Sequence, residues 1–213
     1  KEEAILRSLE QLRRKDTRHP IGDVLPIVTD IMRTLEAMGT AERLTPAGSV
    51  RRFEETIGDV DCIGTSEQPQ RFMDQFVTMP IVREVLGHGS TKSSIVTAQG
   101  LQVDVRLVEP RNYGNLLQHF TGSKQHNILL REFAQRKGLS VSEYGVTEVA
   151  TGAVFSCLTE EEVYDRLGLP YLPPELRQGL DEIDRAVRGR LPRLVELSDV
   201  RGDLHAHTDW SDG

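Results

Sequence analysis

Three aspartates occupy positions from which their carboxylates could bind metal ions together. Asp59 and Asp61 are separated by one residue, and Asp104 lies in a later segment of alternating residues. Alternate side chains of a β-strand share one face, so a strand through Asp59 and Asp61 would hold both carboxylates side by side. Neighbouring carboxylates repel each other unless a cation lies between them. If Asp104 is on an adjacent strand, the three would form an oxygen-rich site suited to Mg²⁺ (or Mn²⁺).

The chemistry that such a site supports is phosphoryl or nucleotidyl transfer. Two ions about 4 Å apart can activate an attacking hydroxyl and stabilise a leaving pyrophosphate. An isolated Asp-x-Asp pair is more often simply solvated, but here Gly48-Ser49 lies ten residues upstream. Glycine lets the backbone approach a phosphate, and the serine hydroxyl can donate to it. Arg51-Arg52 adds guanidinium groups suited to a triphosphate, so the ordered set favours a nucleotide site.

The elements that must position these residues indicate an α+β fold, with a twisted mixed sheet flanked by helices and a smaller α+β subdomain after it. Apolar residues recur at helical spacing after Asp23, which can cap the helix, and Gly39 follows its end. The first part of the chain is expected to contain helices over 23–38, 70–76 and 81–86, a strand up to Thr45 and a strand over 59–65.

A β-hairpin is the clearest prediction in the sequence. The segments TKSSIVTA and LQVDVRLV flank Gln99-Gly100, a pair typical of a turn. In the second segment, apolar residues alternate with Gln102, Asp104 and Arg106. The apolar set should face a core, and the polar set should face outward.

The segment after Pro110 predicts a second, smaller unit. Ser123 can cap a helix that runs to Lys137 and ends at Gly138. A β-rich piece follows over 139–155, with Thr151-Gly152 as a turn. Thr159 and Glu162 have the spacing of a capping box at the start of another helix.

Composition bounds the class of protein. The 213 residues carry a formal net charge of −7, and no apolar run approaches the length of a membrane span. The two cysteines, Cys62 and Cys157, have no ligand-like spacing, which favours a reduced, cytoplasmic protein that we expect to be a monomer. Net negative charge argues against binding nucleic acid by bulk charge alone. However, residues 119–137 carry several basic side chains against the single acidic Glu132.

Four motifs in this order give the chain a specific resemblance: Gly-Ser-x-Arg-Arg, Gly-Asp-x-Asp, Val-Asp-Val-Arg-Leu and Phe-Thr-Gly-Ser. They resemble the family X DNA polymerases, above all the bacterial type in which a PHP phosphoesterase domain follows the polymerase core. The resemblance covers nearly the whole chain from Arg18 onward. It implies a DNA-directed DNA polymerase core that adds a deoxynucleotide to a primer 3′-hydroxyl in gap-filling base excision repair. The implied partners are a dNTP and gapped or primed DNA.

The resemblance also implies roles for single residues. Asp59 and Asp61 would bind two Mg²⁺ (or Mn²⁺) ions, and Asp104 would bind the catalytic ion and assist attack by the primer. His119 stands where the DNA polymerase beta type has Tyr, and Lys124 where it has an acidic residue, so sugar discrimination and base contacts are not carried over. The implied nucleotide-binding residues are Arg18, Gly48, Ser49, Arg52, Gly58, His119, Phe120, Gly122 and Asn127, and the implied template contacts are Lys124 and Arg131.

The resemblance divides the chain into four parts. Residues 1–15 would be a remnant of the helical DNA-binding or fingers region, 16–110 the catalytic palm, 111–198 the nucleotide- and template-binding thumb, and 199–213 a linker with the first strand of a PHP domain. His205, His207 and Asp212 resemble the opening PHP motif but are an incomplete metal site. We therefore expect a piece of a longer protein, with no exonuclease activity and weak DNA affinity of its own.

Two other functions are compatible with parts of the sequence. The Gly-Ser and Asp-x-Asp pattern is shared with nucleotidyltransferases that act on other acceptors, such as RNA ends, proteins or small molecules. The helix with Asn127 and Arg131 argues against these, because such enzymes have no use for a template-side helix. A catalytically weak nucleotide- or DNA-binding module is the other alternative, against which the intact set of three aspartates argues.

Overall fold

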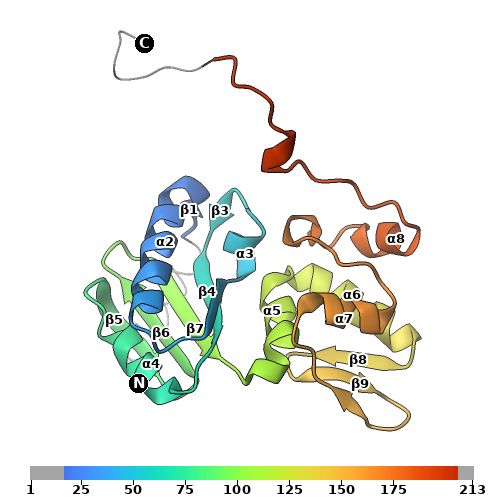
Figure 1. Cartoon of the computed structure of the whole chain (residues 1–213), viewed down its shortest axis with the longest axis horizontal. Helices are drawn as coiled ribbons and strands as arrows, with labels where there is room; N and C mark the ends of the chain where they lie inside the picture. Colours follow the sequence, from blue (N-terminus) through green and yellow to red (C-terminus); the bar gives the residue numbers. More distant parts are fainter. Residues whose placement is uncertain (1–16, 206–213) are drawn as a thin grey trace, which may run out of the picture.

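The computed structural model describes residues 17–205, which form two lobes lying side by side (Figure 1). The first lobe contains a five-stranded mixed sheet, and the second contains a three-stranded antiparallel sheet with its own helices. The expected α+β fold is therefore confirmed. The helix expected within residues 1–15 and the PHP-motif residues His207 and Asp212 lie outside the described residues.

The elements follow one another without long gaps until residue 187. The first lobe comprises β1 (His19–Pro20), α2 (Ile21–Ala37), β2 (Arg43–Pro46), α3 (Gly48–Arg51), β3 (Thr56–Ile57), β4 (Asp59–Thr65), α4 (Pro69–Val77), β5 (Val82–His88), β6 (Lys92–Thr97) and β7 (Gln102–Leu107). The second comprises the 3₁₀ turn η1 (Pro110–Asn112), α5 (Tyr113–Thr121), α6 (Lys124–Arg136), β8 (Leu139–Ser142), β9 (Gly145–Glu148), β10 (Val154–Phe155), α7 (Glu160–Leu167), η2 (Pro174–Leu176) and α8 (Glu182–Val187). A further 3₁₀ turn, η3 (Leu197–Asp199), lies in the extended segment that leads away from both lobes (Figure 1).

The large sheet has one apolar face and one polar face. Its strand order is β2-β4-β7-β6-β5, and β4 and β7 run parallel while the other neighbours are antiparallel. Helices α2 and α4 bury their apolar side chains against one face, where they meet Val103 and Val105 of β7. Gln102, Asp104 and Arg106 of β7 therefore lie on the opposite face, as the alternation predicts.

The β6–β7 hairpin is confirmed, and so are strand β4 and helix α4. The turn is closed by the amide of Gly100, which donates to the carbonyl of Thr97 at 2.9 Å. Gly100 has a φ of 89°, a left-handed conformation that glycine adopts without a steric cost. The hairpin register places Ser94 opposite Asp104 and Val96 opposite Gln102.

The predicted helix over 81–86 is wrong, because this segment forms the edge strand β5. Its pairing with β6 is interrupted by register shifts between Val82 and Glu84 and between Val85 and Gly87. Each bulge adds a residue and breaks the two-residue alternation of side chains. The apolar residues of the segment consequently fall at a spacing that resembles a helix.

The start of α2 also differs from the prediction. The helix begins at Ile21 after Pro20, and no side chain caps it. Asp23 is instead an acidic residue of the first turn, where it can interact favourably with the helix dipole. The end is as predicted, since Gly39 follows with a φ of 67°.

The second lobe has its own apolar core, which includes Leu130 and Phe133 of α6 and Val163 of α7. The Ser123 hydroxyl accepts the His126 amide at 3.0 Å, which confirms it as the N-cap of α6. Thr159 caps α7, but the predicted reciprocal bond is displaced by one residue. The Glu162 carboxylate accepts the amide of Leu158 at 2.7 Å, one residue before the cap. Across residues 17–205, no helix is long and apolar enough to cross a membrane.

Candidate active site at the seam between the lobes

The register of β4 and β7 brings the predicted carboxylates together. Asp61 pairs with Asp104 across the two parallel strands, and Asp59 pairs with Gln102. Residues paired in this way point to the same face, so Asp59, Asp61 and Asp104 share the polar face of the sheet. The condition on which the three-carboxylate site depended, that the two strands are neighbours, is met.

The charge state of Asp61 reflects this crowding. Burial, and after it the carboxylates of Asp59 and Asp104, raise the pKa of Asp61 to about 7, while Arg106 and Lys92 act in the opposite direction. A carboxylate with two like-charged neighbours in a partly desolvated position binds a proton or a cation readily. The donor set therefore fits a hard divalent cation such as Mg²⁺.

The backbone around Gly48 contributes to the same site. The Ala47 amide donates to the Asp61 carbonyl at 2.7 Å, which joins the start of α3 to β4. Gly48 has a φ of 58°, and a Cβ atom at this position would lie 3.1 Å from Asp61 Oδ2. Only a residue without a side chain leaves this carboxylate room, so the predicted importance of glycine here has a steric reason. Ser49 follows in the first turn of α3 and is half-buried.

Among the described residues, no three acidic, histidine or cysteine side chains are drawn close enough to form a ready metal cage. Like-charged carboxylates repel each other when no cation lies between them. The backbone register that would let them converge is nevertheless in place. The residues therefore fit a metal that would draw the side chains together on binding.

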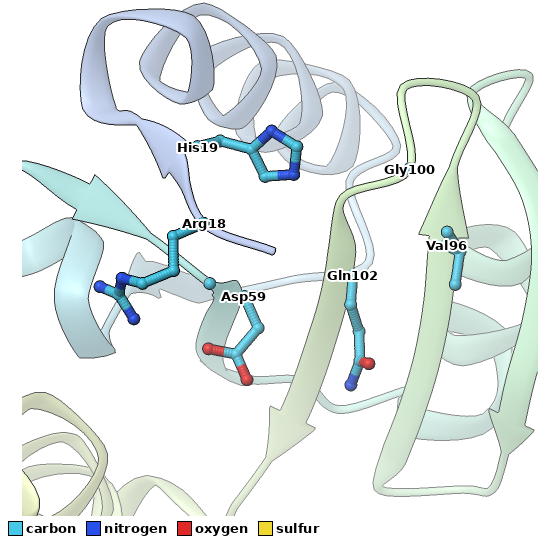
Figure 2. A pocket seen from close by; sticks show the side chains of 7 residues that line it. Arg18, His19, Asp59, Val96, Gly100 and Gln102 are labelled. Carbon is cyan, nitrogen blue, oxygen red and sulfur yellow. The ribbon is translucent and has the colours of Figure 1, made fainter. Parts of the chain in front are cut away.

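Gln102 was not predicted as part of the site. Its Nε2 donates to both Oδ1 and Oδ2 of Asp104 at 3.2 Å. Its position in the alternating polar set was a signal that it shares the face of Asp104, but the hydrogen bonds depend on side-chain geometry. Figure 2 shows Gln102 beside a cavity of about 220 Å³ that is also lined by Arg18, His19, Gly58 and Asp59.

The far end of the polar face is covered by the second lobe. Ile63 of β4 packs with Tyr113, Leu116 and Leu117 in a small core that joins the lobes. Beside it, the Arg106 guanidinium lies over the Phe120 ring, 4.5 Å from the ring centroid. The polar face thus has a seam end, which the second lobe covers, and an open end, where β4 and β7 begin at Asp59 and Gln102 and the cavity lies. The three carboxylates lie between these two ends.

An ionic network across the seam was also missed by the sequence reasoning. Arg51 donates to the hydroxyl of Thr121 and to Oε2 of Glu160, each at 2.7 Å. The other carboxylate oxygen of Glu160 accepts from Arg177 at 2.5 Å, and both Glu160 and Arg177 are fully buried. Although burial alone would raise the pKa of Glu160, the two arginines lower it below its usual value. Sequence spacing gave no signal for this network, because Arg51 and Glu160 are 109 residues apart.

Arg52, predicted to bind a triphosphate, also faces the seam. Its Nη1 donates to the carbonyl of Thr121 at 2.8 Å, and its Nε contacts Glu54 at 3.2 Å. Arg18 lines the cavity, but its guanidinium points away from it, beyond Asp59 (Figure 2). The guanidinium donates to the hydroxyl of Thr56 at 2.8 Å. A Cβ atom on Gly58 would lie 3.4 Å from the Arg18 guanidinium, so these two predicted residues are neighbours.

The Asn127 amide organises the turn that carries the remaining predicted nucleotide-binding residues. Its Nδ2 donates to the carbonyl of His119 at 2.7 Å, and its Oδ1 accepts from Gln118 at 3.1 Å. A side chain on Gly122 would collide with Asn127 Oδ1 at 2.7 Å. His119 and Phe120 are half-buried at the seam, and burial lowers the pKa of His119. The turn is thus held by Asn127 through one N–H and one lone pair of its side-chain amide.

The predicted template residues lie on α6 of the second lobe, and His205 lies in the extended segment. Lys124 and Arg131 are exposed on α6. His205 is exposed in the extended segment beyond both lobes (Figure 1).

Comparison with known proteins agrees with this architecture. Residues 116–178 match the family described as DNA polymerase beta thumb. The whole chain is 37% identical over 214 residues to the DNA polymerase/3′-5′ exonuclease PolX of Bacillus subtilis (strain 168) and spans 37% of that protein. It is 28% identical over 190 residues to DNA polymerase lambda of Rattus norvegicus, covering 75% of this chain and 33% of the relative. An 80-residue segment, 37% of this chain and 16% of the relative, is 32% identical to DNA-directed DNA/RNA polymerase mu of Homo sapiens.

The chain thus combines an α+β fold with a segment that matches the DNA polymerase beta thumb, and its relatives are named DNA polymerases. The chain is similar to DNA polymerases of this type, and its similarity to the bacterial PolX relative extends over its full length. It spans about a third of the length of the first two of these relatives.

Proposed function

We propose that this chain is the nucleotidyl-transfer core of a family X DNA polymerase, which adds a deoxynucleotide to a primer 3′-hydroxyl during gap filling in DNA repair. The observation that carries the proposal is the parallel register that sets Asp61 beside Asp104, with Asp59 on the same face and Gly48 pressed against Asp61. Its relatives are named DNA polymerases, which supports a primed or gapped DNA and a dNTP as substrates.

Asp59, Asp61 and Asp104 would hold divalent cations, Mg²⁺ or Mn²⁺. When bound, these would supply positive charge to activate the primer hydroxyl and to stabilise the leaving pyrophosphate. Asp104 would lie nearest the attacking hydroxyl, because Gln102 holds its carboxylate from the open end of the face. We propose the boundaries 16–110 for the palm and 111–198 for the thumb.

The remaining predicted residues would bind substrate. Ser49 and the glycine backbone at Gly48 would donate to the triphosphate, with Arg18, Arg52 and the backbone at Gly58 near it. Phe120 and Gly122 would border the sugar and base, while Asn127 holds their turn. Lys124 and Arg131, exposed on α6, would contact the template strand. Because His119 is held neutral by burial, it would contribute hydrogen bonds rather than charge at neutral pH.

The decisive test is primer extension on a one-nucleotide-gapped duplex with Mg²⁺ or Mn²⁺. We expect templated addition by this chain and a loss of at least about a thousandfold in the Asp104→Ala variant, because a carboxylate that organises the reacting groups is removed. Thermal unfolding should show that both proteins are folded.

Three outcomes would contradict the proposal. Untemplated addition to diverse acceptors would identify a nucleotidyltransferase of another class. Absence of addition, with metal-dependent nucleotide binding retained, would identify a binding module. Extension that is equal in the wild type and in Asp104→Ala would show that the reaction takes place elsewhere.

A further inference from the structure

The cavity at the open end of the polar face shares Arg18 and Gly58 with the proposed triphosphate site, but no role has been assigned to its other wall or to His19. It is bounded by Arg18, His19, Gly58 and Asp59 on one side and by Val96, Gly100 and Gln102 on the other, and has a volume of about 220 Å³. Figure 2 shows the His19 ring above the space between Asp59 and Gln102, with the Gly100 loop to one side. The Arg18 guanidinium points away from this space, on the other side of Asp59 (Figure 2).

The position of the cavity relative to the carboxylates limits what can occupy it. The seam end of the polar face is closed by Ile63 and by the Arg106 guanidinium, which stacks on the Phe120 ring. The start of α3 and the Phe120–Gly122 turn, proposed to bind the nucleotide, belong to that side. In a displacement at phosphorus, the attacking hydroxyl and the leaving group lie on opposite sides of the reacting atom. With the sugar and base at the seam side, and with the Arg18 guanidinium directed away from the cavity, the open end is the side left for the strand that carries the attacking hydroxyl.

The donors that line the cavity suit a phosphodiester. In the described part of the chain, the His19 imidazole has no hydrogen-bond or ion-pair partner, although its backbone pairs with Ile57 through β1 and β3. An imidazole N–H can donate to a phosphate oxygen whether the ring is neutral or charged. Gly100 carries no side chain on its wall, and nothing lies within 4 Å of the position that its Cβ would take, so a sugar-phosphate backbone can approach closely.

We infer that His19 binds the primer strand, by donating to the phosphodiester that joins its last two nucleotides. This inference rests on the proposed function and deepens it, because it assigns the open end of the face to the primer terminus. Arg18, the residue just before β1, and His19, the first residue of β1, would then serve the two substrates from opposite sides of Asp59: Arg18 the nucleotide and His19 the primer. The chemistry recognised is a phosphodiester oxygen and requires no particular base.

A chemical double-mutant cycle tests the contact. The full chain and its His19→Ala variant are titrated in Ca²⁺ with primed duplex that carries either a native phosphodiester or a neutral methylphosphonate at that linkage. We expect His19→Ala and the methylphosphonate each to weaken binding about fivefold, the value of one hydrogen bond. The two changes together should weaken it no further than either alone. His19→Gln, which keeps a donor, should recover part of the loss.

The control variant is His88→Ala, which removes a histidine of the same lobe that pairs with Asp74 and does not line the cavity. It should keep the full sensitivity to the methylphosphonate. Losses that add in the His19→Ala cycle would overturn the inference. So would an increase of the nucleotide KM in His19→Ala with unchanged primer affinity, since the cavity would then belong to the triphosphate.

The failure of this inference and the failure of the proposed function give different results. If the wild-type chain does not extend primers, the proposed function fails, whereas the binding cycle in Ca²⁺ still decides whether His19 contacts the primer. If the chain extends primers but the losses add, only the assignment of His19 fails. Thermal midpoints of the His19 variants within about 2 °C of the wild type would exclude unfolding as the cause of weaker binding.

Discussion

Asp61 is a partly buried carboxylate that lies close to other carboxylates and to the backbone of Gly48. It is the middle carboxylate of three, it pairs with Asp104 across the strands, and its own backbone carbonyl anchors the turn before α3. Burial and like charge raise its pKa to about 7, so its negative charge is costly without a cation. Gly48 lies so close to it that any larger residue would displace it. Strongly shifted pKa values of this kind are common at functional sites.

Substitution of Gln102 should lower the rate of the reaction through its effect on Asp104. Gln102→Leu keeps the size of the side chain but removes the amide that donates to both oxygens of Asp104. If the amide positions Asp104 for the reaction, kcat should fall about tenfold, the typical cost of losing a residue that orients a metal ligand. The nucleotide KM should change little, because Gln102 lies at the end of the face away from the proposed nucleotide side. Single-nucleotide extension over a range of dNTP and Mn²⁺ concentrations measures both quantities.

Two variants separate positioning from a structural role. Ser94→Ala removes a polar side chain directly opposite Asp104 on β6 and should leave kcat near the wild-type value. Gln102→Arg restores N–H donors at the same position and should recover much of the rate. A loss in Gln102→Leu that Gln102→Arg does not restore, or that Ser94→Ala shares, would argue against the positioning role.

At the scale of elements, the second lobe is held together by a buried polar chain as well as by its apolar core. The Tyr164 hydroxyl of α7 lies 3.1 Å from His126 Nε2, and His126 Nδ1 lies 2.8 Å from Glu182 Oε1. Burial lowers the pKa of His126, which favours a neutral ring that accepts from Tyr164 and donates to Glu182. The Glu182 carboxylate also accepts the amides of Gly179 and Leu180, each at 2.8 Å. These hydrogen bonds connect the segment before α8 to α6, the helix that carries the proposed template contacts.

The stability of this lobe should depend on acid pH through Glu182. Burial opposes its ionisation, but the bonds from His126 and from backbone amides outweigh burial and lower the pKa of Glu182 from 4.5 to about 2. A carboxyl whose pKa is lower in the folded protein stabilises the fold fully above its unfolded value, and this contribution is lost as the pH falls from about 4.5 to about 2. The shift corresponds to on the order of 3 kcal/mol.

Denaturant unfolding at pH 6 and pH 3 measures this contribution. The wild type should lose more stability between these two pH values than Glu182→Gln, which has no charge to lose. Asp181→Asn provides a control, because Asp181 is exposed and pairs with Arg185 at the surface. An equal loss of stability in the wild type and in Glu182→Gln would contradict the assignment.

At the scale of the whole molecule, the two lobes are joined asymmetrically. Glu160 and Arg177 belong to the second lobe and pair with each other at 2.5 Å, fully buried. Arg51 belongs to the first lobe and forms a second ion pair with the Glu160 carboxylate at 2.7 Å. Its side chain is 20% exposed. If Arg51 left, Glu160 would still be paired. The contact between the lobes can thus be broken without leaving a buried charge uncompensated.

This asymmetry predicts different effects for the two partners. Arg51→Met should lower the free energy of unfolding by about 1 kcal/mol, since Glu160 keeps Arg177. Glu160→Gln should lower it by about 3–5 kcal/mol, because the buried Arg177 guanidinium loses its counter-charge. Urea unfolding followed by circular dichroism gives both values. Equal losses in the two variants would show that the three residues act as one unit and that the lobes do not separate at this point.

Much of the site is determined by local sequence alone. The alternation around Asp59–Asp61 and around Asp104 predicts strands with these carboxylates on one face, because the β period of two residues is a property of the backbone. The hairpin turn at Gly100 and the Ser123 cap are likewise local. The prediction of a helix over 81–86 was wrong because the bulges of this edge strand depend on its pairing with β6, which local sequence does not reveal.

The tertiary structure decided which distant residues meet. Whether β4 and β7 are neighbours, and in which register, depends on how the sheet assembles, and it sets Asp61 beside Asp104 rather than one position away. The bond from Gln102 to Asp104, the pairing of Arg51 with Glu160 and the cavity beneath His19 arise from packing between elements. Long-range side-chain contacts leave no periodic mark in a single sequence, because burial and charge compensation are settled only when the chain is compact. The sequence by itself therefore determined the chemistry this protein carries, and the fold decided how that chemistry is arranged.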